Sequence, residues 1–252
     1  MKKTKWRLYR DFAWIEHIVG PPEDYIEESE FFSKVIKENA KIGTKTLLHF
    51  GCGAGGHDYT FKEHFKVTGV DISDEMLKIA RELNPEITYL NGDMRAIELD
   101  ERFDAVAIPD SIGHMTTIED LQKAILTADM HLSPGGILLI VTAVKEDFRE
   151  NNFIYIGSKE DTEVTLFENN YIPDPAGTTY EATAVFLIRR KGKLEIQSDT
   201  ETLGLFTLST WLDLLRDKGL EVKQMDLNHA YDPYLIKEGE YPLKVFVCSK
   251  PL

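Results

Sequence analysis

The sequence predicts an α/β domain with a mostly parallel sheet, helices on both of its faces and an antiparallel β insertion. Short apolar runs alternate with amphipathic segments of about 10–15 residues, which is the pattern of βαβ units. The nearly uninterrupted apolar run over 137–144 is typical of a strand buried on both faces. Helical spacing then disappears between 151 and 206, where the pattern indicates successive strands.

The first half of the chain supplies most of the parallel sheet. Apolar residues at helical spacing predict a helix over 23–41, which ends near Gly43. Ser73 is a good N-cap for a helix over 74–83, and Thr116 or Thr117 for one over 117–132. The strands predicted between these helices are 46–50, 67–71, 87–90 and 103–108.

The second half completes the sheet and carries the insertion. Ser133-Pro-Gly-Gly136 predicts a turn into a fifth strand over 137–144. Lys191-Gly192 is a good hairpin turn between two long strands of the insertion. The remaining elements are these insertion strands at 179–190 and 193–203, a helix over 209–218 that ends at Gly219, and strands at 221–227 and 243–249.

Composition excludes several classes of protein. The 252 residues contain 29 Lys and Arg against 43 Asp and Glu, a net charge of −14. This balance argues against nucleic acid and anionic membrane surfaces as partners, since both require basic patches. Two cysteines cannot form a disulfide framework, and no apolar run reaches the roughly 20 residues of a membrane span. No signal-peptide pattern follows the basic start, so a cytoplasmic location is expected.

A glycine-rich turn follows the first strand and predicts a ligand site. Gly51-x-Gly53-x-Gly55-Gly56 exposes backbone N–H groups at the carboxyl edge of the sheet, where open α/β sheets bind ligands. Asp71 ends the next strand, and its carboxylate can accept both hydroxyls of a ribose. Gly51, Gly53 and Gly56 also satisfy the dinucleotide pattern, so this turn admits either NAD or S-adenosylmethionine.

The end of the third strand favours S-adenosylmethionine. Asn91-Gly-Asp93-Met94 offers an acid and an adjacent backbone N–H, which can read the amine and a ring nitrogen of adenine. At this point the sequence resembles the class I S-adenosylmethionine-dependent methyltransferases. The resemblance covers residues 46–141 through the blocks L-L-H-F-G-C-G-A-G-G, V-T-G-V-D-I-S-D-E-M-L, N-G-D-M, F-D-A-V and L-S-P-G-G-I-L-L-I, and it returns over 206–220. Asp110-Ser-Ile-Gly-His114 and the antiparallel segment look most like sugar N-methyltransferases.

The resemblance implies a fold and an organisation. The fold is a Rossmann-like seven-stranded sheet whose last strand, 243–249, runs antiparallel to the others. The chain would be a single methyltransferase domain over 1–252. Its parts would be a helical lid segment (1–45), a cofactor-binding core (46–150), a β-rich insertion or cap (151–206) and a segment that completes the sheet (207–252).

The resemblance also assigns roles to residues around the cofactor, S-adenosyl-L-methionine, whose product is S-adenosyl-L-homocysteine. Gly51, Gly53 and Gly55 would contact its methionine part, and Asp71 its ribose. Ile72, Asp93 and Met94 would contact the adenine. Asp110 and Ser111 would lie beneath the sulfonium and the substrate. The family usually has an acid two residues before the first glycine, where this chain has His49. That departure implies weaker cofactor binding or a substitute acid, for which Asp110 is the candidate.

Methyl transfer from a sulfonium needs mainly proximity and alignment, and a base where the nucleophile arrives protonated. His114 is the best base candidate, and His57 and His229 are weaker ones. The resemblance also suggests that Tyr9, Trp14 or Tyr25 shields the sulfonium, an arrangement that gains cation–π attraction. Residues of the insertion that could line an acceptor pocket are Tyr155, Phe167, Tyr171 and Tyr180. No Cys or His pair has metal-ligand spacing, so no metal is expected.

The function predicted from these features is transfer of a methyl group to N or O of a small molecule. The acidic insertion favours a neutral or cationic acceptor. One alternative is a non-catalytic methyltransferase-like module that binds a metabolite or a partner, which the substitution at His49 keeps open. An NAD-dependent oxidoreductase is the other alternative. The hairpin at 179–203 could present an edge for a homodimer.

Overall fold

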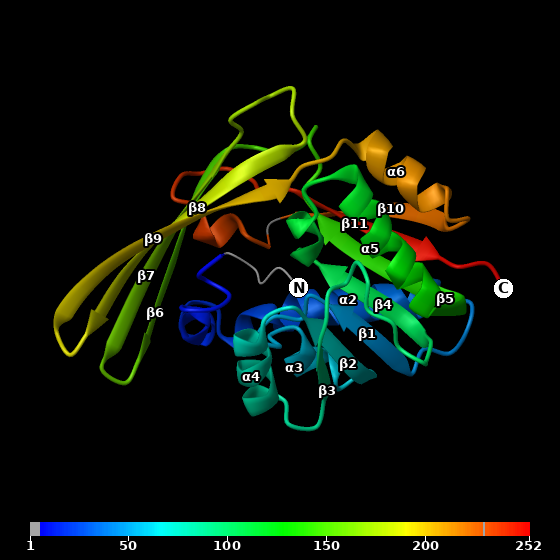
Figure 1. The fold of residues 1–252 in the computed structure, drawn as a ribbon, viewed down its shortest axis with the longest axis horizontal. Coiled ribbons are helices and arrows are strands. Elements are labelled where there is room, and N and C mark those ends of the chain that lie inside the picture. Colours follow the sequence, from blue (N-terminus) through cyan, green and yellow to red (C-terminus); the bar gives the residue numbers. More distant parts are fainter. Residues whose placement is uncertain (1–5, 229) are drawn as a thin grey trace.

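A seven-stranded sheet forms the centre of the computed structural model, which describes residues 6–228 and 230–252. The strand order is β10-β11-β5-β4-β1-β2-β3 (Figure 1). β11 is antiparallel to both of its neighbours, and the pairs among β1 to β5 are parallel, so the predicted fold class is confirmed. The strands are β1 (Thr46–Phe50), β2 (Lys66–Asp71), β3 (Thr88–Asn91), β4 (Phe103–Pro109), β5 (Leu132–Thr142), β10 (Glu221–Leu227) and β11 (Leu243–Ser249).

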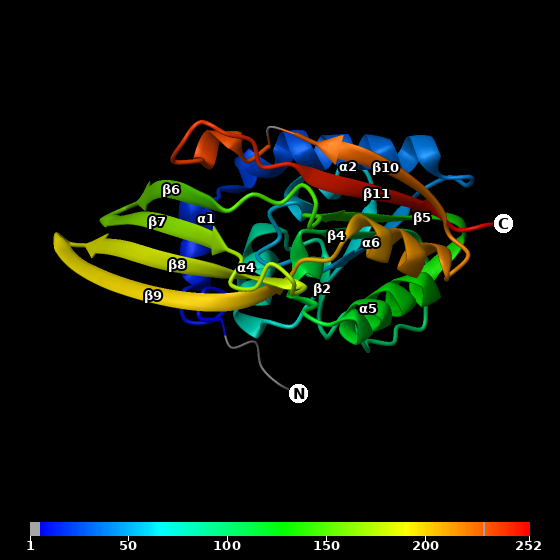
Figure 2. The ribbon, with the colours of Figure 1, turned by 90° about the horizontal axis from the view of Figure 1, so that it is seen from above.

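Helices cover both faces of this sheet because successive strand side chains point to opposite faces. Leu47 packs with α2, α3 and α4, whereas Leu48 packs with α5 and α6. Figure 2 shows α2 on one side of the sheet and α5 and α6 on the other. The helices are α2 (Ile26–Asn39), α3 (Asp58–Phe61), α4 (Asp74–Leu83), α5 (Ile118–His131) and α6 (Leu208–Arg216). None of the helices in the described part of the chain is long and apolar enough to cross a bilayer.

Local signals position most of these elements where the sequence indicated. The exceptions are α3, which the sequence did not indicate, and the start of β5. The Ser73 hydroxyl accepts a hydrogen bond from the Met76 N–H, and Thr117 caps α5 in the same way. The fifth strand begins earlier than predicted, at Leu132, and the predicted turn is a bulge within it: the register against β4 shifts after Phe103, and Gly135 has a φ of +79°. The Gly135 N–H donates to the carbonyl of Lys250, and the Lys250 N–H donates to the carbonyl of Gly136. This pairing with the chain's last residues holds the bulge in place.

The insertion forms a separate four-stranded antiparallel sheet in the order β6-β7-β8-β9. It curves away from the end of the central sheet (Figure 1). Along β8 buried and half-buried residues alternate, so one face of the insertion packs against protein. Its strands are β6 (Asn151–Lys159), β7 (Thr162–Tyr171), β8 (Thr179–Arg190) and β9 (Lys193–Gly204).

The N-terminal segment packs on this inner face. It contains three short helical pieces, η1 (Ala13–Ile15), α1 (Glu16–Val19) and η2 (Pro22–Tyr25). Buried Phe12, Ile15 and Val19 join Val164 and Phe186 in a core distinct from those of the central sheet. Because Gly157 on β6 has no side chain, α1 can approach closely: a Cβ atom there would lie 1.6 Å from the carbonyl oxygen of Ile18. The segment therefore bridges the insertion and the carboxyl edge of the central sheet.

Candidate active site

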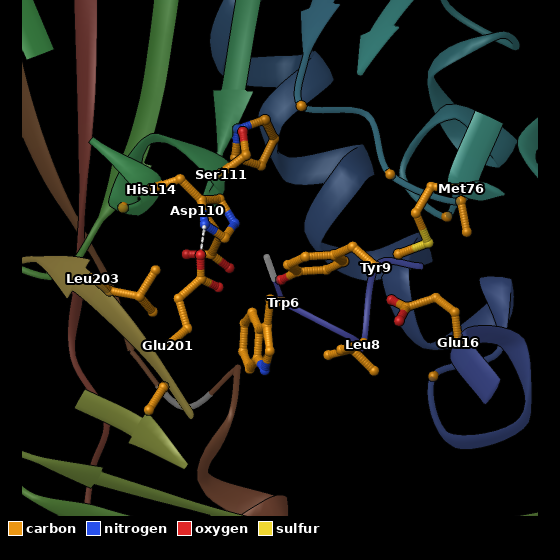
Figure 3. A pocket seen from close by; sticks show the side chains of 18 of the residues that line it. Trp6, Leu8, Tyr9, Glu16, Met76, Asp110, Ser111, His114, Glu201 and Leu203 are labelled. Atoms are coloured by element: carbon orange, nitrogen blue, oxygen red, sulfur yellow. Dashed lines mark hydrogen bonds and ion pairs between the residues drawn. The ribbon is translucent and has the colours of Figure 1, made fainter. Parts of the chain in front are cut away.

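A cavity of about 760 Å³ lies where the central sheet, the N-terminal segment and the insertion meet. This is within the size range of small-molecule sites, roughly 300–1,000 Å³. The ends of β1, β2 and β4 form its floor, and residues 6–28 form one wall. Strands β6 to β9 and the loop before β11 close the opposite side. Figure 3 shows Tyr9, Asp110, His114 and Glu201 converging on this space.

The glycine turn leaves bare backbone on the floor. Gly51 has a φ of +66°, and a Cβ atom on it would lie 2.2 Å from the Ser111 hydroxyl oxygen. That hydroxyl donates to the carbonyl of Phe50 at 3.0 Å, which fixes it beneath the turn. Only glycine therefore fits at 51, and the floor remains open to a ligand lying against Gly51 and Gly53.

Asp71 lies beside this turn at the end of β2. One of its carboxylate oxygens accepts the Gly53 N–H at 2.9 Å and the other accepts the Ser73 N–H at 2.8 Å. Burial raises the pKa of Asp71, and the two backbone N–H groups partly offset that effect. Each carboxylate oxygen keeps a further lone pair, and the two together suit the paired hydroxyls of a ribose.

The next strand end brings Ile72, Asp93 and Met94 to the same cavity. Arg95 forms an ion pair with Asp93 at 2.6 Å and a second one with Asp120 at 2.9 Å. Burial alone would raise the pKa of Asp93, but the hydrogen bonds from Arg95 outweigh it and lower that pKa. The carboxylate of Asp93 is thus ionised and held in one orientation at the edge where an adenine is expected.

The structure places two predicted site residues away from the cavity. A Cβ atom on Gly55 would lie 2.8 Å from both the Asn84 amide nitrogen and the Tyr89 hydroxyl, so Gly55 faces the protein interior, and Gly56 borders the cavity. Trp14 is 37% exposed, and the Arg190 guanidinium lies 4.5 Å from the centre of its ring. Trp14 therefore packs on the outside of the insertion and cannot cover a cofactor.

Tyr9 and Tyr25 do border the cavity, as does Trp6. The Ser73 hydroxyl donates to the backbone carbonyl of Tyr9, which ties the N-terminal segment to the start of α4. Tyr9 packs edge-on against Trp6, with ring centres 5.1 Å apart. Burial raises the pKa of Tyr9 and of Tyr25, so both hydroxyls stay protonated near neutral pH.

His49 belongs to a buried network behind the glycine turn. Its Nδ1 lies 2.7 Å from a carboxylate oxygen of Asp58 on α3, and the other oxygen of Asp58 accepts the Tyr89 hydroxyl at 2.9 Å. A carboxylate therefore does lie close behind the turn, supplied by a helix that the sequence did not indicate. The predicted substitute, Asp110, lies in the cavity instead. Its φ of +53° is strained for a residue with a side chain, and it accepts the Tyr231 hydroxyl at 2.7 Å.

His114 borders the cavity and is paired with a carboxylate. Its Nδ1 is 3.2 Å from a carboxylate oxygen of Glu201 on β9, and its ring centre is 5.4 Å from that of Tyr9. The pairing joins residues 87 positions apart, so no local pattern pointed to Glu201. His57 is less suited to act as a base, because burial lowers its pKa to about 3. His229 lies outside the described residues.

The remaining wall is rich in tyrosine and carboxylate side chains. Tyr155 and Tyr180 border the cavity as expected, whereas Phe167 and Tyr171 do not. No local pattern pointed to the other members, because they come from α1, α2, β7 and the segment between β10 and β11: Glu16, Glu28, Glu168, Tyr231, Tyr234 and Tyr241. Within 6–228 and 230–252, no group of three or more His, Cys, Asp or Glu side chains could hold a metal ion.

Comparison with known proteins bears on this geometry. Residues 47–136 match the family model of a methyltransferase domain. An N,N-dimethyltransferase of dTDP-3-amino-3,4,6-trideoxy-alpha-D-glucopyranose from Streptomyces venezuelae is 32% identical over 124 residues, 48% of this chain and 52% of that protein. An N,N-dimethyltransferase of dTDP-4-amino-2,3,4,6-tetradeoxy-D-glucose from Saccharopolyspora spinosa is 26% identical over 185 residues, 72% of this chain and 73% of its own. The first match thus spans about half of the relative.

The crystal structure of DesVI from Streptomyces venezuelae shares the fold, with a TM-score of 0.77 at 23% identity over 96% of each chain. The predicted resemblance to the class I methyltransferases is confirmed by these matches.

Proposed function

We propose that this chain, which carries a methyltransferase domain and resembles the sugar N-methyltransferases, transfers a methyl group from S-adenosylmethionine to an amino group of a small, sugar-like acceptor. One observation carries the proposal. A single cavity joins the glycine turn and Asp71 to the paired side chains of His114 and Glu201. A cofactor bound at the glycine turn and Asp71 would therefore share one space with His114, the candidate base.

The cofactor side of the cavity suits S-adenosylmethionine. In this proposal Gly51 and Gly53 face the methionine part, Asp71 holds the ribose and Ile72, Asp93 and Met94 surround the adenine. The bare turn supports this assignment, because Gly51 and Gly53 border the cavity with backbone alone. When bound, S-adenosylmethionine supplies a methyl group already activated on a sulfonium. Asp110 is placed to hold the methionine ammonium, and the Tyr9 ring to face the sulfonium.

His114 prepares the acceptor. With the proton on Nδ1 donated to Glu201, Nε2 keeps a lone pair and can take a proton from an ammonium group. The freed nitrogen lone pair then forms the new N–C bond while the S–C bond breaks and its electrons stay on sulfur. An imidazole can take a proton from an ammonium group, but a sugar hydroxyl is far too weak an acid for it. This difference favours N over O as the acceptor atom.

Two named relatives are N,N-dimethyltransferases, so we extend the proposal to two successive rounds on one nitrogen. The enzyme would act in the cytoplasm, consistent with Cys52 and Cys248 being buried free thiols. A homodimer remains a separate proposal, which sedimentation of the purified chain tests.

The test has a binding arm and a turnover arm. Calorimetry should show S-adenosylhomocysteine binding and no NAD binding; the reverse result would sink the proposal. Methyl-labelled cofactor should then transfer label to amino sugars, both free and linked to thymidine diphosphate. Binding of S-adenosylhomocysteine without transfer to any amine would favour the non-catalytic module.

A further inference from the structure

Resting on the proposed function, we propose that the acceptor enters as a cationic amine that carries no phosphate, unlike the dTDP-linked sugars named for the relatives. Three features of the cavity point to this class of substrate. They are an unpaired group of carboxylates, the shortage of cationic side chains and a wall of tyrosines.

Glu28, Asp110 and Glu168 form what we call the carboxylate cluster. They come from α2, the end of β4 and β7, and all three border the cavity. Within the described part of the chain, none of them forms an ion pair with Lys, Arg or His. One carboxylate oxygen of Glu28 is buried without any hydrogen-bond partner among those residues. The described residues thus supply no counter-charge to the cluster. The methionine ammonium assigned above to Asp110 would leave the half-buried Glu28 and Glu168 without one.

The pKa values of the cluster show that its carboxylates repel one another. Burial raises the pKa of Glu28 to about 8, and the nearby charge of Asp110 adds to the effect. Burial also raises the pKa of Glu168, again with a contribution from Asp110. Protons therefore neutralise part of the cluster when no ligand is present. An ammonium group can replace those protons, because an opposite charge favours the ionised carboxylates.

The cavity has few cationic side chains that could bind a phosphate. Among its described lining residues Arg95 is the one Lys or Arg, and it is already bound to Asp93 and Asp120. Burial lowers the pKa of both His17 and His57, so neither supplies a positive charge near neutral pH. A diphosphate would therefore meet carboxylates instead of cations, and like charges brought together cost several kcal/mol.

The tyrosine wall suits an uncharged body that carries an amine. Tyr155 packs against Tyr234 with ring centres 4.9 Å apart, and Tyr241 packs edge-on against Phe153 at 5.0 Å. Glu168 lies on the neighbouring strand and accepts a hydrogen bond from Asn170 at 2.9 Å. Aromatic rings can pack against the carbon skeleton of a sugar and attract a nearby ammonium. The wall thus provides contact area without any need for phosphate.

A matched pair of probes tests the proposal. The enzyme saturated with S-adenosylhomocysteine is titrated with 3-amino-3-deoxyglucose and with the same sugar linked to thymidine diphosphate. The free amine should bind at least about tenfold more tightly, which corresponds to 1.4 kcal/mol. Equal or tighter binding of the nucleotide-linked sugar overturns the inference, as does no binding of the free amine. Failure of S-adenosylhomocysteine itself to bind would instead contradict the proposed function.

A pair of variants on β7 tests the role of the cluster. Glu168→Gln removes the charge but keeps the shape, and it should raise KM for the free amine by roughly 10- to 100-fold, as expected for the loss of a charged hydrogen bond. Its affinity for S-adenosylhomocysteine should not change. Glu163→Gln, an exposed position on the same strand, is the control and should leave both values unchanged. A KM for Glu168→Gln equal to that of the control overturns the inference.

Discussion

Replacing Asp71 by alanine separates cofactor binding from folding. The carboxylate accepts two backbone N–H groups, at 2.9 and 2.8 Å, and retains lone pairs for two ribose hydroxyls. A hydrogen bond to a charged group contributes about 1.5–3 kcal/mol, so losing two to the ribose costs about 3–6 kcal/mol. Affinity for S-adenosylhomocysteine should therefore fall roughly 10²- to 10⁴-fold. The two N–H groups border the cavity, where water can replace the lost acceptor, so we expect a loss of only about 1–2 kcal/mol in folding stability.

Calorimetry measures the first quantity and thermal unfolding of the ligand-free protein the second. The melting temperature of Asp71→Ala should drop by about 2–8 °C, and the variant should stay folded at 25 °C. Asp74→Ala is the matched control, because it removes an exposed carboxylate three positions along the chain. If Asp71→Ala binds S-adenosylhomocysteine within threefold of the unmodified chain, the ribose does not lie at Asp71 and the cofactor assignment fails.

Three further predictions follow from the same geometry. His114→Gln should lower kcat about 10²- to 10³-fold in the labelled-methyl assay and leave cofactor affinity unchanged, and Glu201→Gln should lower kcat less. An unaltered kcat in both variants would show that His114 is not the base. Gly51→Ala should lower the free energy of unfolding in urea by about 2–4 kcal/mol, because of its φ of +66° and the overlap with a serine hydroxyl, whereas Gly43→Ala, with open space around it, should not. The pKa of Glu28 is about 8 in the folded protein and 4.5 in the unfolded chain, so between these pH values the folded state holds a proton that the unfolded state has lost. The free energy of unfolding of the ligand-free protein should therefore fall as the pH rises from 4.5 to 8. Urea midpoints across the window should decline less for Glu28→Gln, and equal slopes would contradict the assignment.

The sequence predicted best those elements whose signals are local. The hairpin of β8 and β9 was found because alternation runs up to a Lys-Gly turn, and α4 because Ser73 caps it. The first residues of β5 were missed because their partners, Phe103 on β4 and Lys250, are distant in the sequence. The four-residue helix α3 is too short to show a hydrophobic period, so Asp58 and its bond to His49 were missed with it.

The difference between local and long-range signals also explains which site residues could be predicted. Gly51, Asp71 and Asp93 were predicted to lie together because each is at or just after the end of a strand and parallel strands end at one edge, and all three border the cavity. Glu168 and Glu201 lie on strands of the insertion, where a polar residue reads as solvent-facing until the partner surface is known. Trp14 was placed wrongly because short helical pieces have no repeat that indicates which side is buried.

The bridging position of the N-terminal segment has a consequence for how the chain assembles during synthesis. The Arg7 N–H donates to Asp199, and the Arg7 guanidinium donates to Gln197 at 3.1 Å, so the first described residues are fixed by a strand made about 190 positions later. Contacts so distant in sequence form late, because the whole intervening loop must close. During synthesis the N-terminal segment must therefore wait for β9. A nascent chain can therefore pair His114 with Glu201 only after β9 has emerged, long after the strand ends that carry Gly51 and Asp71.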